Sequence, residues 1–273
     1  MAILLTDIGG TKARFCWLKN GKLEKFVEYR CDYFRTLYDV IDEFIKSVPE
    51  SFDGLVLAGA GPVKKGQLQW TNRLNWKTSE KELAKRYKLK KVLIVNDAQA
   101  QGEGLKNLYK CNQTTILLSV GTGLGGCFIV NGKVVSGEVG QIKTESGERV
   151  EDAVSGTGIV KLYHTFGGSK KIKSAREIQH LRQEKDKVAQ LAYKTFYQKW
   201  GEISGRLVTA LYAQGGVYLW GGLIPQNQKD KAVLLTAYKK TLPPALKKIP
   251  LRLVKDEMLA FKGLRSLSNR EFF

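Results

Sequence analysis

The chain begins with an apolar segment that runs into an acid and then directly into a glycine turn. Residues 1–14 read MAILLTDIGGTKAR, in which Asp7 precedes Gly9, Gly10 and Thr11. A strand that turns through glycines exposes backbone N–H groups, and such groups can hold phosphate oxygens. Asp7, at the mouth of the turn, could bind a magnesium ion through the ion's water ligands.

A second strand followed by a glycine turn occurs much later in the chain. The apolar segment 114–119 leads into VGTGLGG at residues 120–126, with Gly121, Thr122 and Gly123 at its centre. A single glycine turn after a strand usually has no ligand, so only the presence of two such turns indicates a nucleotide site. Two such strand-and-turn units predict two domains that close on one nucleotide from opposite sides.

The composition is that of a folded protein of a reducing compartment. The chain has 273 residues, of which 43% are hydrophobic, enough for two ordinary domains. It shows no signal peptide and no apolar run long enough to cross a bilayer, so we expect a cytoplasmic protein without a membrane partner. The scattered cysteines argue against a zinc site or a disulfide scaffold, and they are Cys16, Cys31, Cys111 and Cys127.

The net charge is unusual. Lys and Arg number 45 against 26 Asp and Glu, which gives +19. Such a balance favours anionic partners, including nucleic acid. The basic residues are nevertheless spread along the chain, and the densest cluster, at residues 85–91, lies at the end of a predicted helix and before a strand. Without an arginine-rich arm or an aromatic RNA-binding signature, nucleic acid is not the expected partner.

The order of predicted elements is the same in the two halves of the chain. The first half reads as three successive strands followed by alternating helices and strands, at residues 3–8, 13–18, 23–30, 34–48 (helix), 54–60, 79–88 (helix) and 91–95. The second half restarts with strands and a long helix, at residues 114–119, 127–130, 133–135, 188–211 (helix), 216–220, 251–254 and 258–267 (helix). This order predicts a mixed sheet of the RNase H-like kind in each half.

Six motifs occur in the order in which bacterial glucokinases carry them, and they read DIGGTKAR, VNDAQA, VGTGLGG, GEVGQ, ERVEDAVSGTG and LWGGLIP. Through them the chain resembles that family, within the actin-like sugar kinase superfamily, over most of its length. The resemblance implies an α/β fold with two RNase H-like (actin-like ATPase) domains and a cleft between them for sugar and ATP. It implies a small N-terminal domain over residues 1–109, joined by a C-terminal helix at 257–273, and a large domain over 110–256.

The resemblance also implies an activity. We expect an ATP:hexose phosphotransferase that phosphorylates the primary (6-) hydroxyl of glucose or a closely related hexose, with ATP and Mg²⁺ bound. The expected partners are therefore small molecules, and, because family members are often dimers, a homodimer is a further expectation.

Asp97 is the candidate catalytic residue. It follows a predicted strand within VNDAQA, and the family places its catalytic base at the aspartate of this Asn-Asp pair. A carboxylate there could accept the proton of a sugar hydroxyl while aiming its oxygen at the γ-phosphorus. The alternative is a helix cap, because Asp97 precedes a helical segment.

The resemblance assigns sugar binding to Asn96, Asp97, Glu138, Gln141 and Glu151. Carboxylate and amide oxygens suit this task because each can accept a short hydrogen bond from a hydroxyl. The alternatives are an exposed loop acid at Glu138 and a solvated helix residue at Glu151. Gln141 departs from the family pattern GEGGH, since this chain has GEVGQ, and the identity of the sugar is therefore open.

The resemblance assigns nucleotide binding to the glycine turns, namely Gly9, Gly10, Thr11, Gly121, Thr122, Gly123, Gly221 and Gly222. Gly221 and Gly222 match the turn on which adenosine lies close to the backbone, and the alternative for them is a turn that merely ends a strand. The segment Thr71–Asn72 and the residue Trp76 resemble a support segment of the family, which packs behind the residues of the sugar site.

Two other hypotheses stay open on the sequence. One is a kinase for an amino sugar or an anhydro sugar on the same fold. The other is a non-catalytic sugar sensor or a nucleic-acid-associated protein, which only the net charge suggests. A panel of sugars in an ADP-release assay discriminates among them.

Overall fold

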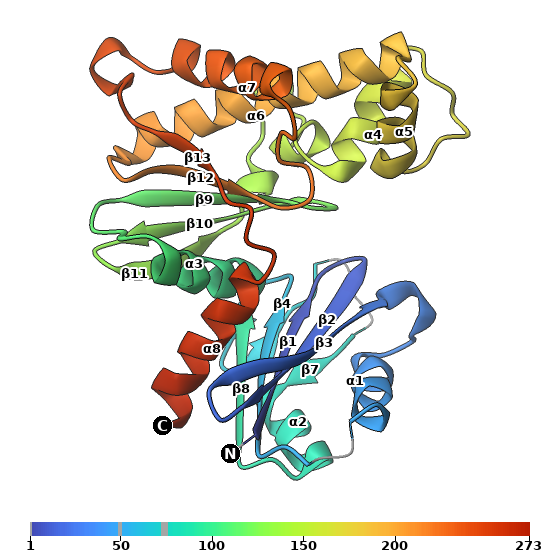
Figure 1. Cartoon of the computed structure of the whole chain (residues 1–273), viewed down its shortest axis with the longest axis vertical. Helices are drawn as coiled ribbons and strands as arrows, with labels where there is room; N and C mark the ends of the chain where they lie inside the picture. The colour runs from blue at the N-terminus through green and yellow to red at the C-terminus, as the bar shows by residue number, and fades with distance from the viewer. Residues whose placement is uncertain (1, 49–50, 72–75) are drawn as a thin grey trace. The chain divides into compact units, whose positions relative to one another are not determined.

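The structure, a computed structural model, describes residues 2–48, 51–71 and 76–273 (Figure 1). Asn72 of the predicted support segment lies outside these residues. The chain divides into two compact units, one of residues Met1–Lys110 with Asp256–Phe273 (unit 1) and one of Cys111–Lys255 (unit 2).

Unit 1 is built on a five-stranded mixed sheet in the order β3-β2-β1-β4-β8. Its strands are β1 (Ala2–Ile8), β2 (Lys12–Lys19), β3 (Lys22–Arg30), β4 (Gly54–Gly59) and β8 (Lys91–Asn96). The first three pair antiparallel, whereas β1, β4 and β8 run parallel. A smaller sheet contains β5 (Val63–Lys64), β6 (Gln67–Leu68) and β7 (Thr78–Ser79).

Helices cover both faces of this sheet because successive strand residues point to opposite sides. In β1, Ile3 and Leu5 join the apolar cluster of α8, and Leu4 and Ile8 join the cluster that contains α1. The helices of unit 1 are η1 (Cys31–Tyr33), α1 (Leu37–Lys46), α2 (Glu80–Tyr87), α3 (Asp97–Leu108) and α8 (Leu259–Phe272).

Helices α3 and α8 pack closely together (Figure 1). A Cβ atom on Gly104 would lie 1.9 Å from the carbonyl oxygen of Leu259, and one on Gly263 would lie 1.8 Å from that of Ala100. The backbones of α3 and α8 can therefore pack this closely only because Gly104 and Gly263 have no side chain.

The helix predicted over residues 34–48 is shorter in the structure. Phe34 is extended, with φ −125° and ψ 137°, and α1 begins at Leu37. Thr36 is the reason, because its side chain accepts from the Asp39 N–H while the Asp39 carboxylate accepts from the Thr36 N–H. This capping box fixes the start of the helix.

Unit 2 repeats the sheet order of unit 1 as β11-β10-β9-β12-β13. Its strands are β9 (Thr115–Val120), β10 (Leu124–Val130), β11 (Lys133–Gly137), β12 (Gly216–Trp220) and β13 (Leu251–Leu253). Its helices are η2 (Val139–Gln141), η3 (Val150–Asp152), α4 (Gly156–Thr165), α5 (Ala175–Gln183), α6 (Lys187–Leu211), α7 (Gln228–Thr241) and η4 (Pro244–Leu246). The mixed sheet predicted for each half is therefore present in both units, with the same strand order in each.

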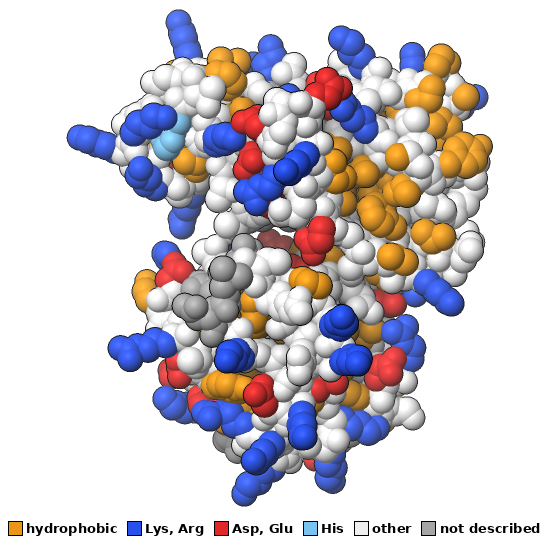
Figure 2. All heavy atoms as spheres, turned by 180° about the vertical axis from the view of Figure 1, so that it is seen from behind, with side chains coloured by type: hydrophobic (Ala, Val, Ile, Leu, Met, Phe, Trp, Pro, Cys, Tyr) orange, Lys and Arg blue, Asp and Glu red, His pale blue; other side chains and the backbone are white. Residues whose placement is uncertain are grey.

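The basic side chains are distributed over the surface. Figure 2 shows Lys and Arg scattered across the visible face of both units, interspersed with acids and neutral residues. None of the helices among the residues described is both long and apolar enough to cross a lipid bilayer.

Candidate active site

In unit 1 the parallel strands end in one row. Ile8 of β1 lies beside Gly59 of β4, and Gly59 lies beside Asn96 of β8. Neighbouring strands are about 4.8 Å apart, so the ends of β1 and β8 are separated by roughly 10 Å. The first glycine turn and the Asn96–Asp97 step therefore share one edge of the sheet.

The glycine turn after β1 is fixed at both ends. The Gly9 N–H donates to the Lys12 carbonyl at 2.9 Å, and the Cys31 N–H donates to the Thr11 carbonyl at 2.9 Å. A Cβ atom on Gly9 would meet nothing nearer than the Lys12 oxygen, at 3.9 Å. The backbone is thus held in place while space stays open over Gly9.

Asp7 is buried beside this turn and forms an ion pair with Arg14. The antiparallel register of β1 and β2 places the two residues directly opposite each other. A buried carboxylate needs such a partner, because burial of an unpaired charge is costly. Arg14 therefore serves as the partner of the buried Asp7 carboxylate next to the turn.

Asn96 and Asp97 join strand β8 to helix α3, and both are half-buried. Asn96 is the N-cap of α3, since its Oδ1 accepts from the Ala98 N–H at 3.0 Å and its Nδ2 donates to the Gly61 carbonyl at 2.9 Å. Asp97 is the first residue of the helix, and its Oδ1 also accepts from the Ala98 N–H, at 2.9 Å. The cap role considered for Asp97 is thus shared with Asn96, at a helix N-terminus that favours negative charge.

In unit 2 two glycine turns follow neighbouring parallel strands. Trp220 of β12 lies beside Ser119 of β9, so the turn at Gly121–Gly123 and the pair Gly221–Gly222 lie about one strand spacing apart. Gly221 has φ +113°, and a Cβ atom there would lie 2.2 Å from the Val120 oxygen. Only glycine fits that position.

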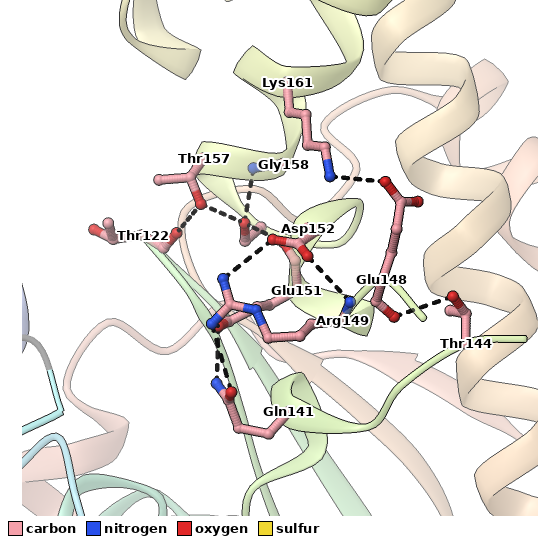
Figure 3. Close-up of polar contacts among 11 residues, drawn as sticks. Thr122, Gln141, Thr144, Glu148, Arg149, Glu151, Asp152, Thr157, Gly158 and Lys161 are labelled. Carbon is pink, nitrogen blue, oxygen red and sulfur yellow. Dashed lines mark hydrogen bonds and ion pairs between the residues drawn. The ribbon is translucent and has the colours of Figure 1, made fainter. Parts of the chain in front are cut away.

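The start of helix α4 is bonded to the second glycine turn (Figure 3). The Gly156 N–H donates to the Gly121 carbonyl at 2.9 Å, and the Thr157 hydroxyl donates to the Thr122 carbonyl at 3.2 Å. The Ser155 hydroxyl lies 2.9 Å from that of Thr157 and donates to the Glu151 carbonyl at 2.6 Å. Ser155 and Thr157 thus lie in contact with each other between the Glu151 carbonyl and the glycine turn.

Gln141 and Glu151 lie side by side in unit 2 (Figure 3). Gln141 Nε2 donates to Glu151 Oε1 at 2.8 Å, and Arg149 Nη1 forms an ion pair with the same oxygen at 2.8 Å. Arg149 also contacts Asp152, and the hydrogen bond from the guanidinium lowers the pKa of that carboxyl. Glu138 is exposed at the start of η2, and its carbonyl accepts from the Gln141 N–H at 3.0 Å.

The motifs that hold these residues are those of a known family. A family model of glucokinases matches residues 4–149 and 141–271, which is nearly the whole chain. The chain belongs to the glucokinase family. It is thereby an ATP-dependent hexose kinase, and the family prediction is confirmed.

Relatives of the glucokinase family align over most of their lengths. The chain is 28% identical to a glucokinase of Rhizobium johnstonii, with 97% of this chain and 90% of that protein covered. It is 29% identical to a glucokinase of Campylobacter jejuni subsp. doylei, with 82% and 79% covered. Among solved structures, a ROK family glucokinase from Streptomyces griseus in complex with glucose and AMPPNP has a TM-score of 0.81 at 16% identity, with 99% and 100% covered.

A glucokinase from an Antarctic psychrotroph shares the fold as well, with a TM-score of 0.76 at 24% identity and with 98% of this chain and 99% of that chain covered. These neighbours confirm the predicted α/β class with two domains of the actin-like kind. The alternatives of an amino-sugar kinase, an anhydro-sugar kinase or a non-catalytic sensor are not favoured by the comparisons.

Each unit of this glucokinase-family chain brings part of the predicted site together. In unit 1 one sheet edge holds Asp7, Gly9–Thr11, Asn96 and Asp97. In unit 2 the sheet edge holds Gly121–Gly123 and Gly221–Gly222. Glu151 joins them, because a Cβ atom on Gly123 would lie 3.0 Å from its Oε2.

Three residues of this arrangement were missed in the sequence. They are Arg14 beside Asp7, Arg149 beside Glu151, and Thr157 on the second glycine turn. Arg14 could have been found, because a short hairpin turn places it opposite Asp7. Arg149 and Thr157 make their contacts through loops, for which the sequence carries no periodic signal.

The residues present also fit a magnesium ion that is bound mainly by a nucleotide and by water. Within the described parts of the chain, no group of three or more His, Cys, Asp or Glu side chains gathers to hold a metal. Magnesium bound to a nucleotide needs no such cage, since phosphates and waters supply most of its ligands. A single carboxylate beside a glycine turn, as at Asp7, would be sufficient to bind the waters of such an ion.

Proposed function

We propose that this chain transfers the γ-phosphoryl group of ATP to the 6-hydroxyl of glucose or a closely related hexose, with Asp97 as the catalytic base. The observation that carries this proposal is the position of Asp97. It starts helix α3 at the sheet edge that also holds the glycine turn Gly9–Thr11. Acceptor activation and phosphate binding thereby come from one rigid element.

Asp97 acts on the sugar, and little other covalent chemistry is required of the protein. Its carboxylate accepts the proton of the primary hydroxyl while that oxygen attacks the γ-phosphorus, and the bond from the γ-phosphorus to the bridging oxygen of ADP breaks. The Asn96 side chain, held by Ala98 and Gly61, fixes the backbone on which Asp97 is carried.

The glycine turns supply the nucleotide site. The backbone of Gly9–Thr11 and of Gly121–Gly123 binds the phosphates, and Gly221–Gly222 lies against adenosine. Magnesium, held through water by Asp7, neutralises phosphate charge when it is bound. Open space over Gly9, Gly121 and Gly222 supports these roles, because an added Cβ atom would meet no heavy atom nearer than 3.9 Å.

Glu138, Gln141 and Glu151 bind the hydroxyl groups of the sugar. Each offers an acceptor oxygen, and a site of this kind rejects sugars that leave an acceptor unpaired. Glucose is the leading substrate because the family model is that of glucokinases.

An ADP-release assay on purified protein tests the proposal. The wild type should consume MgATP with glucose, and a panel of hexoses, amino sugars and anhydro sugars defines the specificity. Asp97→Asn should lower kcat by roughly three orders of magnitude, within the range for loss of a general base, while glucose still binds in a calorimetric titration. Glu43→Gln, an exposed acid on α1, serves as the control. Near wild-type turnover in Asp97→Asn would remove Asp97 from the mechanism.

The cellular compartment and the oligomeric state are part of the same proposal. The four cysteines carry free thiols, which supports a reducing compartment such as the cytoplasm, where a glucose kinase would feed glycolysis. We also propose a homodimer, by likeness to the family, and sedimentation velocity would detect it.

A further inference from the structure

The loop between η2 and η3 folds back on itself and brings its two ends together. The Val150 N–H donates to the Ile142 carbonyl at 2.9 Å, and the Thr144 N–H donates to the Glu148 carbonyl at 2.8 Å. Residues on either side of this loop therefore face each other, and Gln141 meets the residues that follow Glu148 (Figure 3).

Arg149 occupies the centre of the resulting cluster. Its Nη1 lies 2.8 Å from Glu151 Oε1 and donates to Gln141 Oε1 at 3.5 Å. Its Nη2 lies 3.1 Å from Asp152 Oδ1, and its backbone N–H donates to Asp152 Oδ2 at 3.0 Å. The guanidinium group is thus held from two sides and is fixed in direction.

The two oxygens of Glu151 have different surroundings. Oε1 accepts from both Gln141 and Arg149. Oε2 lies on the side of Gly123, where an added Cβ atom would come within 3.0 Å of it. Oε2 is therefore the oxygen that faces the substrate-binding turns, and the charge of Arg149 offsets that of the carboxylate behind it.

We propose that Arg149 is a positioning residue that sets the sugar specificity of this site. It holds the Gln141–Glu151 pair in one orientation and offsets the negative charge of Glu151, so that the site favours a neutral hydroxyl over a protonated amino group. The inference rests on the proposed function, in which Glu151 binds the sugar.

The sign of the effect follows from the charges. A protonated amino sugar is attracted by an uncompensated carboxylate, and Arg149 opposes that attraction. With Arg149, Glu151 and Asp152 ionised, the cluster carries one net negative charge, and removal of Arg149 makes it two. One unit charge a few ångströms away in a half-exposed site changes affinity about tenfold. Loss of Arg149 should therefore favour amino sugars relative to glucose by about that factor.

Three variants separate charge, geometry and stability. Arg149→Gln removes the charge, and Arg149→Lys keeps the charge without the planar fork. Arg270→Gln is the matched control, because Arg270 lies on α8 in unit 1, pairs with a carboxylate (Glu271) at 3.1 Å and is similarly exposed (54% against 48% for Arg149). Steady-state kcat and KM are measured at saturating MgATP for glucose and for its 2-amino and 3-amino analogues, below the pKa of their amino groups. Circular dichroism and thermal unfolding verify the fold.

In Arg149→Gln we expect the KM for glucose to rise about tenfold with kcat within about threefold of the wild type. The ratio of kcat/KM for the better amino analogue to that for glucose should rise about tenfold. Arg149→Lys should raise the KM for glucose but leave that ratio near the wild-type value, and Arg270→Gln should change neither. An unchanged ratio in Arg149→Gln, or an equal shift in Arg149→Lys, would overturn the inference. Wild-type protein without glucose-dependent ATP turnover would instead refute the proposed function.

Discussion

The pair Gly221–Gly222 allows the nucleotide assignment to be tested by adding a single methyl group. At Gly222 an added Cβ atom would meet no heavy atom within 4 Å, whereas at Gly221 it would lie 2.2 Å from the Val120 oxygen. Gly221 also has φ +113°, which L residues rarely adopt, and Gly222 is not among the glycines with positive φ. The two substitutions to alanine should therefore have opposite consequences.

Gly222→Ala should leave the fold intact and weaken nucleotide binding. Replacement of a glycine by alanine at a compatible backbone conformation stabilises a protein by about 0.4–1 kcal/mol, because the unfolded chain loses freedom. If adenosine lies against this turn, the new methyl group enters a packed contact, which costs about 1–3 kcal/mol. The KM for ATP should then rise roughly five- to hundredfold, while the KM for glucose stays unchanged.

Gly221→Ala should instead destabilise unit 2. Its methyl group meets backbone, which cannot move aside as a flexible side chain can. We therefore expect the free energy of unfolding to fall by roughly 2 kcal/mol or more. Chemical denaturation compares the stabilities of the two variants, and calorimetric titration with a non-hydrolysable ATP analogue compares their affinities. A Gly222→Ala protein with wild-type ATP affinity would show that the nucleotide does not contact this turn. A Gly221→Ala protein of wild-type stability would contradict the packing argument.

Three further predictions concern other parts of the molecule. Glu138→Gln should raise the KM for glucose roughly ten- to hundredfold with little change in the KM for ATP, since it weakens a charge-assisted hydrogen bond; an unchanged KM for glucose would contradict its role. Thr157→Val removes the hydroxyl bond to Thr122 and should raise the KM for ATP about two- to tenfold, as steady-state kinetics would show. The hydrogen bond from the Thr36 N–H lowers the pKa of Asp39 below its ordinary 3.8, so its contribution to stability is complete above that pH and disappears as the pH falls through the lowered value. Asp39→Ala should therefore lower the unfolding temperature at pH 7, and its difference from the wild type should shrink as the pH falls below 3.8.

Much of the fold could be predicted from the sequence because strand patterns and turns are local. The Asn20-Gly21 and Asn131-Gly132 dipeptides mark the two hairpins, and both asparagines have positive φ in the structure. The parallel strands were recognisable as short apolar runs between helical segments. The antiparallel half of each sheet then follows, since short turns join β1 to β2 and β3, and β9 to β10 and β11. The parallel neighbours, β1 with β4 and β9 with β12, are joined by long crossover connections instead.

Helix α7 shows why other parts could not be predicted. Its buried positions are Asp230, Leu234 and Tyr238, so a charged residue occupies the face that packs inward. Asp230 is buried because Arg182 of α5 forms an ion pair with it, and the guanidinium group also lies 4.6 Å from the centre of the Tyr193 ring. Hydrophobic periodicity cannot reveal a helix whose inward face depends on a partner distant in the sequence.

The candidate site likewise has residues that the sequence predicts and residues that it does not. Motifs identified the residues at strand ends, because there the backbone dictates where a side chain lies. Asp97 is such a case, as the residue directly after β8. Arg149 is the opposite case. Arg149 stands within the ERVEDAVSGTG motif, but the motif does not show which residues its side chain meets, and its contacts with Gln141 and Glu151 exist only because the intervening loop closes.

The segment that follows this loop serves both substrates in the proposed mechanism. Glu151 binds the sugar, and four residues later Ser155 caps helix α4, whose first residues bond the glycine turn at Gly121–Thr122. The Ser155 hydroxyl donates to the Glu151 carbonyl and lies 2.9 Å from the Thr157 hydroxyl, so a shift of Glu151 would act on the start of α4. Each hydrogen bond contributes only about 1 kcal/mol, yet the path is short and its Ser155 member is fully buried. In the proposed mechanism this path connects the residues assigned to sugar with those assigned to the nucleotide, and Thr157→Val should reduce the effect of glucose on ATP affinity as well as that affinity itself.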